Sequence, residues 1–375
     1  MAEKPLEEFA EIKALEEVAE GYRRALDAER VRHALTKSQL RSMHKEAEAE
    51  KELRDYLFGL THPEEGVSAP KWAVTLNAKK SDHIPVLVAS DFQWGEVIDE
   101  GRMGGVNKFN IRIAQERYRR LIERTIDISF NHLPNNTYRG IVYLRLGDMV
   151  SGDIHEDLNE SNEEHAVGAV RSLVAAELWG IQQLQKHFKK VYVISVPGNH
   201  GRTTKRPMSK RGAFDNYDTL SSWWLESMLG QSKDIDFYTP SSGDAFFSLY
   251  GRRYLATHGD RIGSRGGQGF IGPAATIMRG MKKTFDICAG MHMAIDKMFI
   301  GHFHVAYELD YGWSNGSLPG YSEFARDNRM KPEEPTQWLL FFHKKYGATS
   351  RWRIRLSDEP YVPQSEEQEP FKMEE

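Results

Sequence analysis

Short apolar runs alternate with longer amphipathic stretches from residue 71 to about residue 357. The runs are rich in Val, Ile, Leu, Tyr and Phe, and the stretches between them follow a helical period. This alternation is typical of an α/β domain, which we expect over residues 81–357. Strands are predicted within residues 84–90, 141–146, 191–197, 254–257 and 298–300.

The first 60 residues carry a different pattern, rich in Glu, Ala, Lys, Arg and Leu, with no proline after Pro5. Apolar positions recur there at mixed three- and four-residue spacings, which predicts a helical arm over residues 1–60. The pattern slips after Leu35, so a break or a second helix is expected. Two interpretations stay open: an arm for homo-oligomerisation or partner binding, or helices that pack on the following domain. The positions are Leu6, Phe9, Leu15, Val18, Tyr22 and Leu26.

Two segments lack any regular apolar pattern. Residues 61–80 contain proline and glycine between His62 and Pro70, which indicates a linker. Residues 358–375 hold three prolines among seven carboxylates and one lysine. This acidic tail is predicted to be disordered and solvated.

Composition narrows the class of protein without naming it. Hydrophobic residues at 40% and charged residues at 28% describe an ordinary globular chain, and the net charge of -4 excludes a uniformly basic coat. The single cysteine, Cys288, cannot form an intrachain disulfide, which favours a reducing compartment. Without a signal-peptide pattern or an apolar run near 20 residues, we expect a soluble, cytoplasmic protein away from the membrane.

Each of the five predicted strands runs into polar residues that can bind a metal. In α/β sheets the carboxyl ends of strands share one edge, so these residues are expected to meet there. One such motif alone is weak evidence, whereas five in order predict a metal site. The motifs are Asp91-Phe92-Gln93, Gly147-Asp148, Gly198-Asn199-His200, His258-Gly259-Asp260 and Gly301-His302-Phe303-His304.

The donor types narrow the choice of metal. Carboxylate and amide oxygens mixed with imidazole nitrogen suit Mn²⁺, Fe or Zn²⁺ better than Ca²⁺. In a continued strand His302 and His304 would share one face, so a turn is expected to direct each at its own ion.

The order of these motifs resembles the calcineurin-like metallophosphoesterase superfamily, over about residues 82–320. The resemblance implies two packed mixed β-sheets flanked by helices, a four-layer sandwich, and two divalent ions, Mn²⁺ most of all, with Mg²⁺ also possible. It assigns Asp91 and His304 to the first ion and Asp148 to a bridge between the two. It assigns Asn199, His258 and His302 to the second ion and makes His200 the catalytic histidine.

Two positions depart from the family pattern. Gln93 stands where the family has a histidine, and an amide oxygen is a weaker ligand for a transition metal than imidazole. Gly201 follows Gly-Asn-His, where many relatives carry an acidic residue. The first metal site is therefore expected to be looser, with Gln93 as a direct ligand or as the holder of a bound water.

Basic residues near two motifs bear on the substrate. Arg202, Lys205 and Arg206 follow His200, and Lys210 and Arg211 come next. The second group follows His258 around a glycine-rich run. Such loops beside a phosphoesterase site favour a nucleic-acid substrate held by its backbone, although charged loops are commonly only solvated. The second group is Arg261, Arg265, Arg279, Lys282 and Lys283.

The leading functional hypothesis is therefore a nuclease, with general similarity to the DNA-repair nuclease branch. Bases could stack on Trp94, Trp223 or Trp224, although core aromatics are the more common explanation. Two alternatives stay open. One is a phosphatase or small-molecule phosphodiesterase. Protein phosphatases of the family usually continue the second motif with Asp-Arg-Gly, and its absence after Asp148 counts against a protein substrate. The other is a non-catalytic scaffold of the same fold, to which Gln93 alone points.

Overall fold

A computed structural model describes residues 82–133, 137–154, 156–208, 210–262 and 273–357. The predicted helical arm (1–60), the linker (61–80) and the acidic tail (358–375) lie outside these residues. All elements below belong to the unit that spans His62–Glu375.

The first sheet contains the three strands that precede the first three motifs. Four of its six strands, β1 to β4, are parallel to one another. The other two, β10 and β11, extend the sheet as an antiparallel hairpin on the outer side of β1. The order is β11 (Gly347–Arg355), β10 (Thr336–His343), β1 (His83–Ala89), β2 (Ile141–Arg145), β3 (Val191–Ser195) and β4 (Ile235–Tyr238).

The second sheet is also mixed. Its central strands β6, β7 and β9 are parallel, and β5 and β8 close its two sides in antiparallel pairs. The order is β5 (Ala245–Leu249), β6 (Arg252–Ala256), β7 (Lys297–Ile300), β9 (Gly312–Ser314) and β8 (Tyr307–Leu309).

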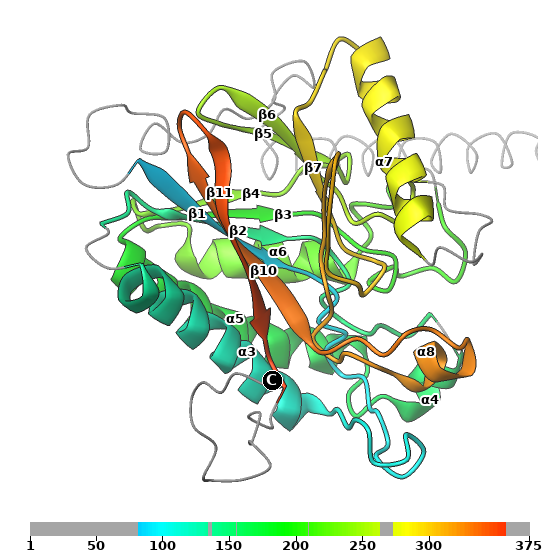
Figure 1. Cartoon of the computed structure of the whole chain (residues 1–375). Coiled ribbons are helices and arrows are strands. Elements are labelled where there is room, and N and C mark those ends of the chain that lie inside the picture. The colour runs from blue at the N-terminus through cyan, green and yellow to red at the C-terminus, as the bar shows by residue number, and fades with distance from the viewer. Residues whose placement is uncertain (1–81, 134–136, 155, 209, 263–272, 358–375) are drawn as a thin grey trace, which may run out of the picture. The chain divides into compact units, whose positions relative to one another are not determined.

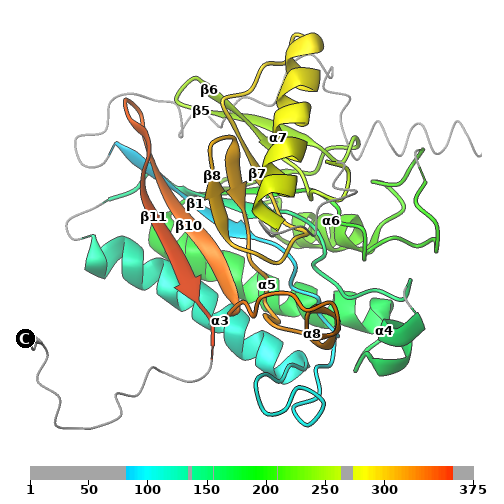
Figure 2. The same ribbon diagram turned by 45° about the vertical axis from the view of Figure 1, so that its right-hand side comes forward.

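Helices cover the outer face of each sheet (Figures 1 and 2). Helices α3, α5 and α6 lie along the first sheet, and α7 lies along the second. The helices are α3 (Ile111–Asp127), continued by the π-helix η1 (Ile128–His132), α4 (Glu156–Ser161), α5 (Ala166–Phe188), α6 (Tyr217–Leu229), α7 (Pro273–Gly290) and α8 (Glu323–Asp327).

Strict alternation along β1 explains the layering. Ile84, Val86 and Val88 face the second sheet, whereas Leu87 and Ala89 face the helices, and all five are at most 1% exposed. Because neighbouring side chains of a strand point to opposite faces, a strand apolar at every position must be covered on both. Burying each large side chain contributes about 1.5–3 kcal/mol.

The layers therefore run helices, sheet, sheet, helix. This confirms the predicted α/β fold of two packed mixed sheets flanked by helices. Within the described part of the chain, none of the helices combines the length and apolar character needed to cross a membrane.

Candidate metal centre

The five motifs directly follow β1, β2, β3, β6 and β7, as the sequence predicts. The carboxyl ends of β1–β3 and of β6–β7 meet where the two sheets face each other. The backbone N–H of Asp91 donates to the Gly147 carbonyl at 3.0 Å, and that of Gly301 donates to the His258 carbonyl at 2.8 Å. The backbone N–H of His302 donates to the Asp91 carboxylate, so motifs more than 200 residues apart in the sequence form one site.

Five of the predicted ligands have a left-handed backbone. Their φ angles are 52° at Asp91, 46° at Gln93, 50° at Asp148, 68° at His302 and 55° at His304. This conformation costs roughly 1–3 kcal/mol for a residue with a side chain, and it persists where the surrounding structure enforces it. The turn expected between His302 and His304 is therefore present, and each of the five side chains is directed by a strained turn.

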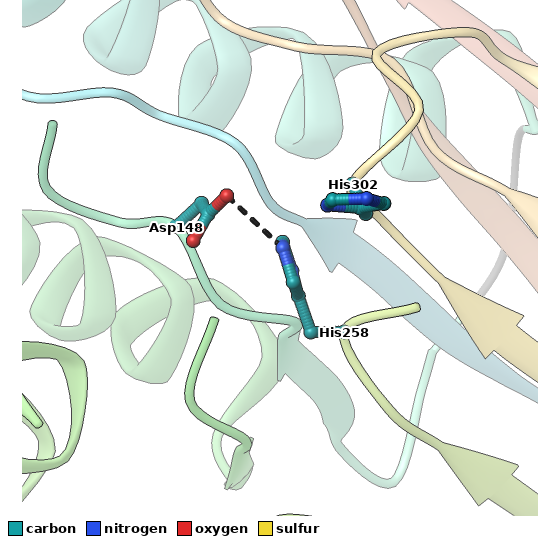
Figure 3. Close-up of side chains that lie close together, drawn as sticks. All are labelled: Asp148, His258 and His302. Carbon is teal, nitrogen blue, oxygen red and sulfur yellow. Dashed lines mark ion pairs between the residues drawn. The ribbon is translucent and has the colours of Figure 1, made fainter. Parts of the chain in front are cut away.

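Asp148 is the centre of the tightest cluster. Its carboxylate, His258 and His302 each present one ligand atom, and these three atoms lie within 4.8 Å of one another (Figure 3). The Oδ2 atom of Asp148 is 3.0 Å from Nε2 of His258. Both residues are 1% exposed, so water does not screen the attraction between them.

The protonation of His258 supports a cation at this cluster. Its Nδ1 atom lies 2.7 Å from the Leu146 carbonyl and donates there, so Nε2 faces Asp148 Oδ2 and, at 3.1 Å, Asn199 Oδ1. A neutral Nε2 would direct a lone pair at two oxygens, and a cation between the three atoms removes that conflict. Burial alone would lower the pKa of His258, but Asp148 raises it to about 10. A metal ion can take the place of this proton.

The same charges shift the pKa values of neighbouring groups. Burial alone would raise the pKa of Asp148, but His258 and His200 hold it well below its ordinary value. Burial and the adjacent His258 lower the pKa of His302 to about 4. His302 is therefore neutral at pH 7, which is the form that binds a metal.

A second group of donors surrounds Asp91. Its Oδ1 atom is 3.3 Å from Nε2 of His304, and both its oxygens accept the backbone N–H of His302, at 3.0 and 3.1 Å. Ser90 also donates its hydroxyl to this carboxylate. Burial alone would lower the pKa of His304, but Asp91 raises it. Asp91 and His304 thus form a second carboxylate–imidazole pair on the other side of the site.

Gln93 lies beside Asp148. Its side chain is 1% exposed, and its Nε2 atom is 3.5 Å from Asp148 Oδ2. Its Oε1 atom is buried and has no hydrogen-bond partner among the described residues. An unpaired buried oxygen costs roughly 1–3 kcal/mol, which coordination to a cation would recover. The donor set, orphaned amide oxygen included, fits divalent cations.

His200 lies at the rim of the site, with 19% of its side chain exposed. Its backbone N–H donates to Asp148 Oδ1 at 2.7 Å, and its Nδ1 is 3.0 Å from the Ser151 carbonyl. Its Nε2 is 3.9 Å from Asp148 Oδ2. The side chain assigned to catalysis is thus beside the metal ligands and is reached by solvent.

The site also depends on buried residues that no motif revealed. Asp218, in the first turn of α6, accepts the backbone N–H groups of Asp148 and Gly198. Burial and Asp148 raise the pKa of Asp218 to about 6. On the Asp91 side, the Gln337 amide exchanges two hydrogen bonds with the Ser90 backbone. The only sequence signal was Asn216-Tyr-Asp218, which is typical of an ordinary helix start.

The predicted substrate-binding residues are more scattered. Arg202 is partly buried and pairs through its backbone with Asn216, whereas Lys205 and Arg206 are exposed. Arg261 reaches toward Gly212 and Gly243 and lies 3.9 Å from Asp260. Arg265 lies outside the described residues. Of the other predicted cations, Arg279, Lys282 and Lys283 belong to α7, where Lys282 pairs with Asp286 at 2.8 Å.

The three tryptophans differ in position. Trp94 is fully buried and donates its Nε1 to Ser172, which excludes base stacking there. Trp223 is half-buried and packs on Phe214, and Trp224 is 40% exposed on α6.

Comparison with known proteins adds little to this geometry. No family model matches the chain, and no curated protein matches it significantly. Among solved structures, the chain is similar to a dimetal phosphatase from Danio rerio, with 11% identity, coverage of 73% of this chain and 99% of that one, and a TM-score of 0.33. A sulfate thiohydrolase, SoxB, from Thermus thermophilus follows, with 9% identity, 75% and 58% coverage and a TM-score of 0.29. Likeness at this level does not bear on function.

Proposed function

We propose that this protein is a metallophosphoesterase that binds two divalent cations and hydrolyses phosphodiester bonds. The observation that carries the proposal is the convergence of seven donor side chains from five strand ends, including the buried and unpaired Oε1 of Gln93. If the site held only ion pairs between these side chains, Oε1 of Gln93 would stay without a partner, whereas a bound cation would coordinate it.

The donors divide into two sets around Asp148. Asp91, Gln93 and His304 would hold one cation, and Asn199, His258 and His302 the other. The carboxylate of Asp148 has two oxygens and would serve both sets. When bound, such cations lower the pKa of water and offset the charge of a phosphate group. Mn²⁺ is our leading candidate for both positions, because the set mixes hard oxygens with imidazole.

His200 would supply the proton for the leaving group. Its Nδ1–H donates to the Ser151 carbonyl, so the Nε2–H of the doubly protonated ring is the proton that would pass to the leaving oxygen, and the neutral ring with Nδ1–H remains. Partial exposure at the rim allows this nitrogen to reach a substrate oxygen. General acid assistance of this kind contributes about 10²–10⁴-fold in rate.

Nucleic acid is the substrate that we favour. The segment after His200 carries Arg202, Lys205 and Arg206 without an intervening acid, and two of these three cations are exposed. Cations beside a hydrolytic centre hold a polyanion through its phosphates, independent of its bases. Nuclease activity by metal-activated water is therefore the specific form of the proposal.

The test is an activity panel with the purified chain, first stripped of metal and then supplemented with Mn²⁺, Mg²⁺, Zn²⁺ or Fe²⁺. The substrates are bis-p-nitrophenyl phosphate, p-nitrophenyl phosphate, and labelled single- and double-stranded DNA and RNA. Cleavage of the diester and of a polymer supports the proposal. Turnover of the monoester alone would identify a phosphatase, and turnover of small diesters alone a small-molecule phosphodiesterase. No turnover with any metal would leave a non-catalytic scaffold.

A further inference from the structure

Asp218 joins two of the five loops that carry the candidate site residues. Its side chain is 2% exposed and lies in the first turn of α6. Its Oδ2 accepts the backbone N–H of Asp148 at 2.9 Å and that of Gly198 at 2.8 Å, while its Oδ1 accepts that of Met149 at 3.0 Å. One carboxylate therefore binds the loop after β2 and the loop after β3.

The start of α6 is held close to the same loops. Asn216, the N-cap, accepts the backbone N–H of Asp218 and donates its Nδ2 to the Gly198 carbonyl, both at 2.8 Å. A Cβ atom at Gly201 would lie 2.4 Å from Asn216 Oδ1 and 3.0 Å from Cγ of Asp218. Gly201 lacks a side chain because the N-cap and the Asp218 carboxylate occupy that space.

Hydrogen bonds to Ser221 and Arg145 also fix the first turn of α6. Ser221 donates its hydroxyl to the Asp218 carbonyl at 2.7 Å and accepts from the Arg145 guanidinium at 2.8 Å. Arg145, at the end of β2, forms a fully buried pair with Glu177 of α5 at 2.7 Å. Movement of Asp218 away from the loops would require this network to break.

We propose that Asp218 is a positioning residue for the metal centre. Its carboxylate holds the left-handed turn at Asp148, whose φ is 50°, and fixes the spacing between Asp148 and the Asn199–His200 segment. The inference rests on the proposed function, because it treats Asp148 and Asn199 as ligands. Among the described residues, the hydrogen bonds of the Asp218 carboxylate all come from backbone N–H groups, so it acts through the residues that it orients.

The expected size of the effect follows from this indirect role. Partners that orient metal ligands typically change metal affinity by about 10–100-fold when they are removed. In Asp218→Asn the shape is kept, but an NH₂ group replaces one oxygen and faces backbone N–H groups that can only donate. If the NH₂ group takes the place of Oδ2, the N–H groups of Asp148 and Gly198 both lose their acceptor; if it takes the place of Oδ1, that of Met149 does.

The experiment titrates the metal-free protein with Co²⁺ alone and follows visible absorption, which reports ligand number and geometry. For Asp218→Asn we expect at least tenfold weaker Co²⁺ binding and a changed spectrum in protein that circular dichroism shows to be folded. Asp234→Asn is the matched control, because Asp234 lies 3.8 Å from Lys190 at the opposite end of the strands. A purely structural role would lower the melting temperature of Asp218→Asn without altering its Co²⁺ spectrum.

A second variant tests the same interaction without touching the carboxylate. Gly201→Ala places a methyl group against Asn216 and Asp218, which pushes the start of α6 away, and it should reproduce the weaker binding if Asp218→Asn does not fold. Wild-type affinity and spectrum in either folded variant would overturn the positioning role. If the wild type binds Co²⁺ but hydrolyses no phosphate ester, the proposed function fails and the positioning role remains.

Discussion

Replacing Asp148 with Asn removes one negative charge from the middle of the site while keeping the shape of the side chain. Oδ1 of Asp148 accepts the His200 backbone N–H at 2.7 Å, so the new amide oxygen takes that place. The new NH₂ group then takes the place of Oδ2, 3.0 Å from His258 Nε2, and can donate to it. We therefore expect the metal-free variant to fold.

We expect Asp148→Asn to lose most of its metal affinity while it keeps the fold. The ligand atoms of Asp148, His258 and His302 lie within 4.8 Å, so a cation among them is within about 4 Å of the carboxylate. At that distance each pair of unit charges interacts by about 4 kcal/mol at an effective dielectric constant near 20. Losing this interaction with a single charge of one ion already lowers the affinity for that ion about a thousandfold. Because the proposed function makes Asp148 a ligand in both donor sets, both ions should dissociate.

Metal content measured after dialysis against a slight excess of Mn²⁺ tests this expectation. The wild type should retain two ions per chain and Asp148→Asn close to none, with turnover abolished. Asp286→Asn, an exposed change on α7, controls for the removal of a negative charge elsewhere. Two ions retained with wild-type affinity would refute the bridging position of Asp148.

The Asp148→Asn variant also tests how the stability of the metal-free protein depends on pH. In the metal-free wild type Asp148 raises the pKa of His258 to about 10 from an ordinary value of 6.5. The stabilisation from this pair is therefore complete below about pH 6.5 and disappears as pH rises through 10. We expect the melting temperature of the metal-free wild type to fall over that window and that of Asp148→Asn to change less. Parallel profiles would show that the two residues do not interact.

Three other changes test separate parts of the site. His200→Ala should keep both metals but lower turnover of a diester with a poor leaving group by about 10²–10⁴-fold. Gln93→His should tighten the first metal site, because imidazole replaces an amide, and lower the Mn²⁺ concentration for half-maximal rate. Neutralising Arg202, Lys205 and Arg206 together should weaken polymer binding and reduce the log–log salt slope by about 0.7–0.9 for each phosphate that the variant no longer neutralises.

Each of these has an outcome that contradicts it. Undiminished turnover of the poor-leaving-group ester would remove His200 from the reaction; nitrophenyl esters are unsuitable here, because their leaving group barely needs a proton. An unchanged Mn²⁺ titration would place the Gln93 side chain outside the coordination sphere. An unchanged salt slope in the triple variant, whose hydrolysis of a small diester serves as the control, would end the nuclease hypothesis without affecting the metal site.

Sequence reasoning succeeded where the information is local. Asp91, Asp148 and His258 could be placed at strand ends because an apolar run and the polar residue after it are adjacent in the chain. It failed where the partner is distant. Nothing around Asp218 indicates that its carboxylate binds two loops, because backbone N–H groups leave no trace in side-chain patterns.

The order of the strands in the sheets could not be predicted from the sequence for a related reason. β10, from the last part of the described chain, pairs with β1 and brings Gln337 against Ser90. Strand pairing over some 250 residues depends on packing of the whole domain, and the apolar run of β10, which was not among the predicted strands, carries no information about its partner. The division of Ile84 and Leu87 between two faces was likewise invisible, since both are equally apolar.

The strained turns at Asp91, Gln93, Asp148, His302 and His304 have a consequence for protein engineering. Glycine adopts positive φ at little cost, so a Gly at any of these positions would relieve backbone strain. At Asp91 and Asp148 this gain is offset, because the carboxylates accept buried N–H groups that would lose their partner. Gln93, whose Oε1 has no hydrogen-bond partner among the described residues, has less to lose. Heat-stable variants chosen without a metal-binding screen should therefore lose the Gln93 side chain before either carboxylate.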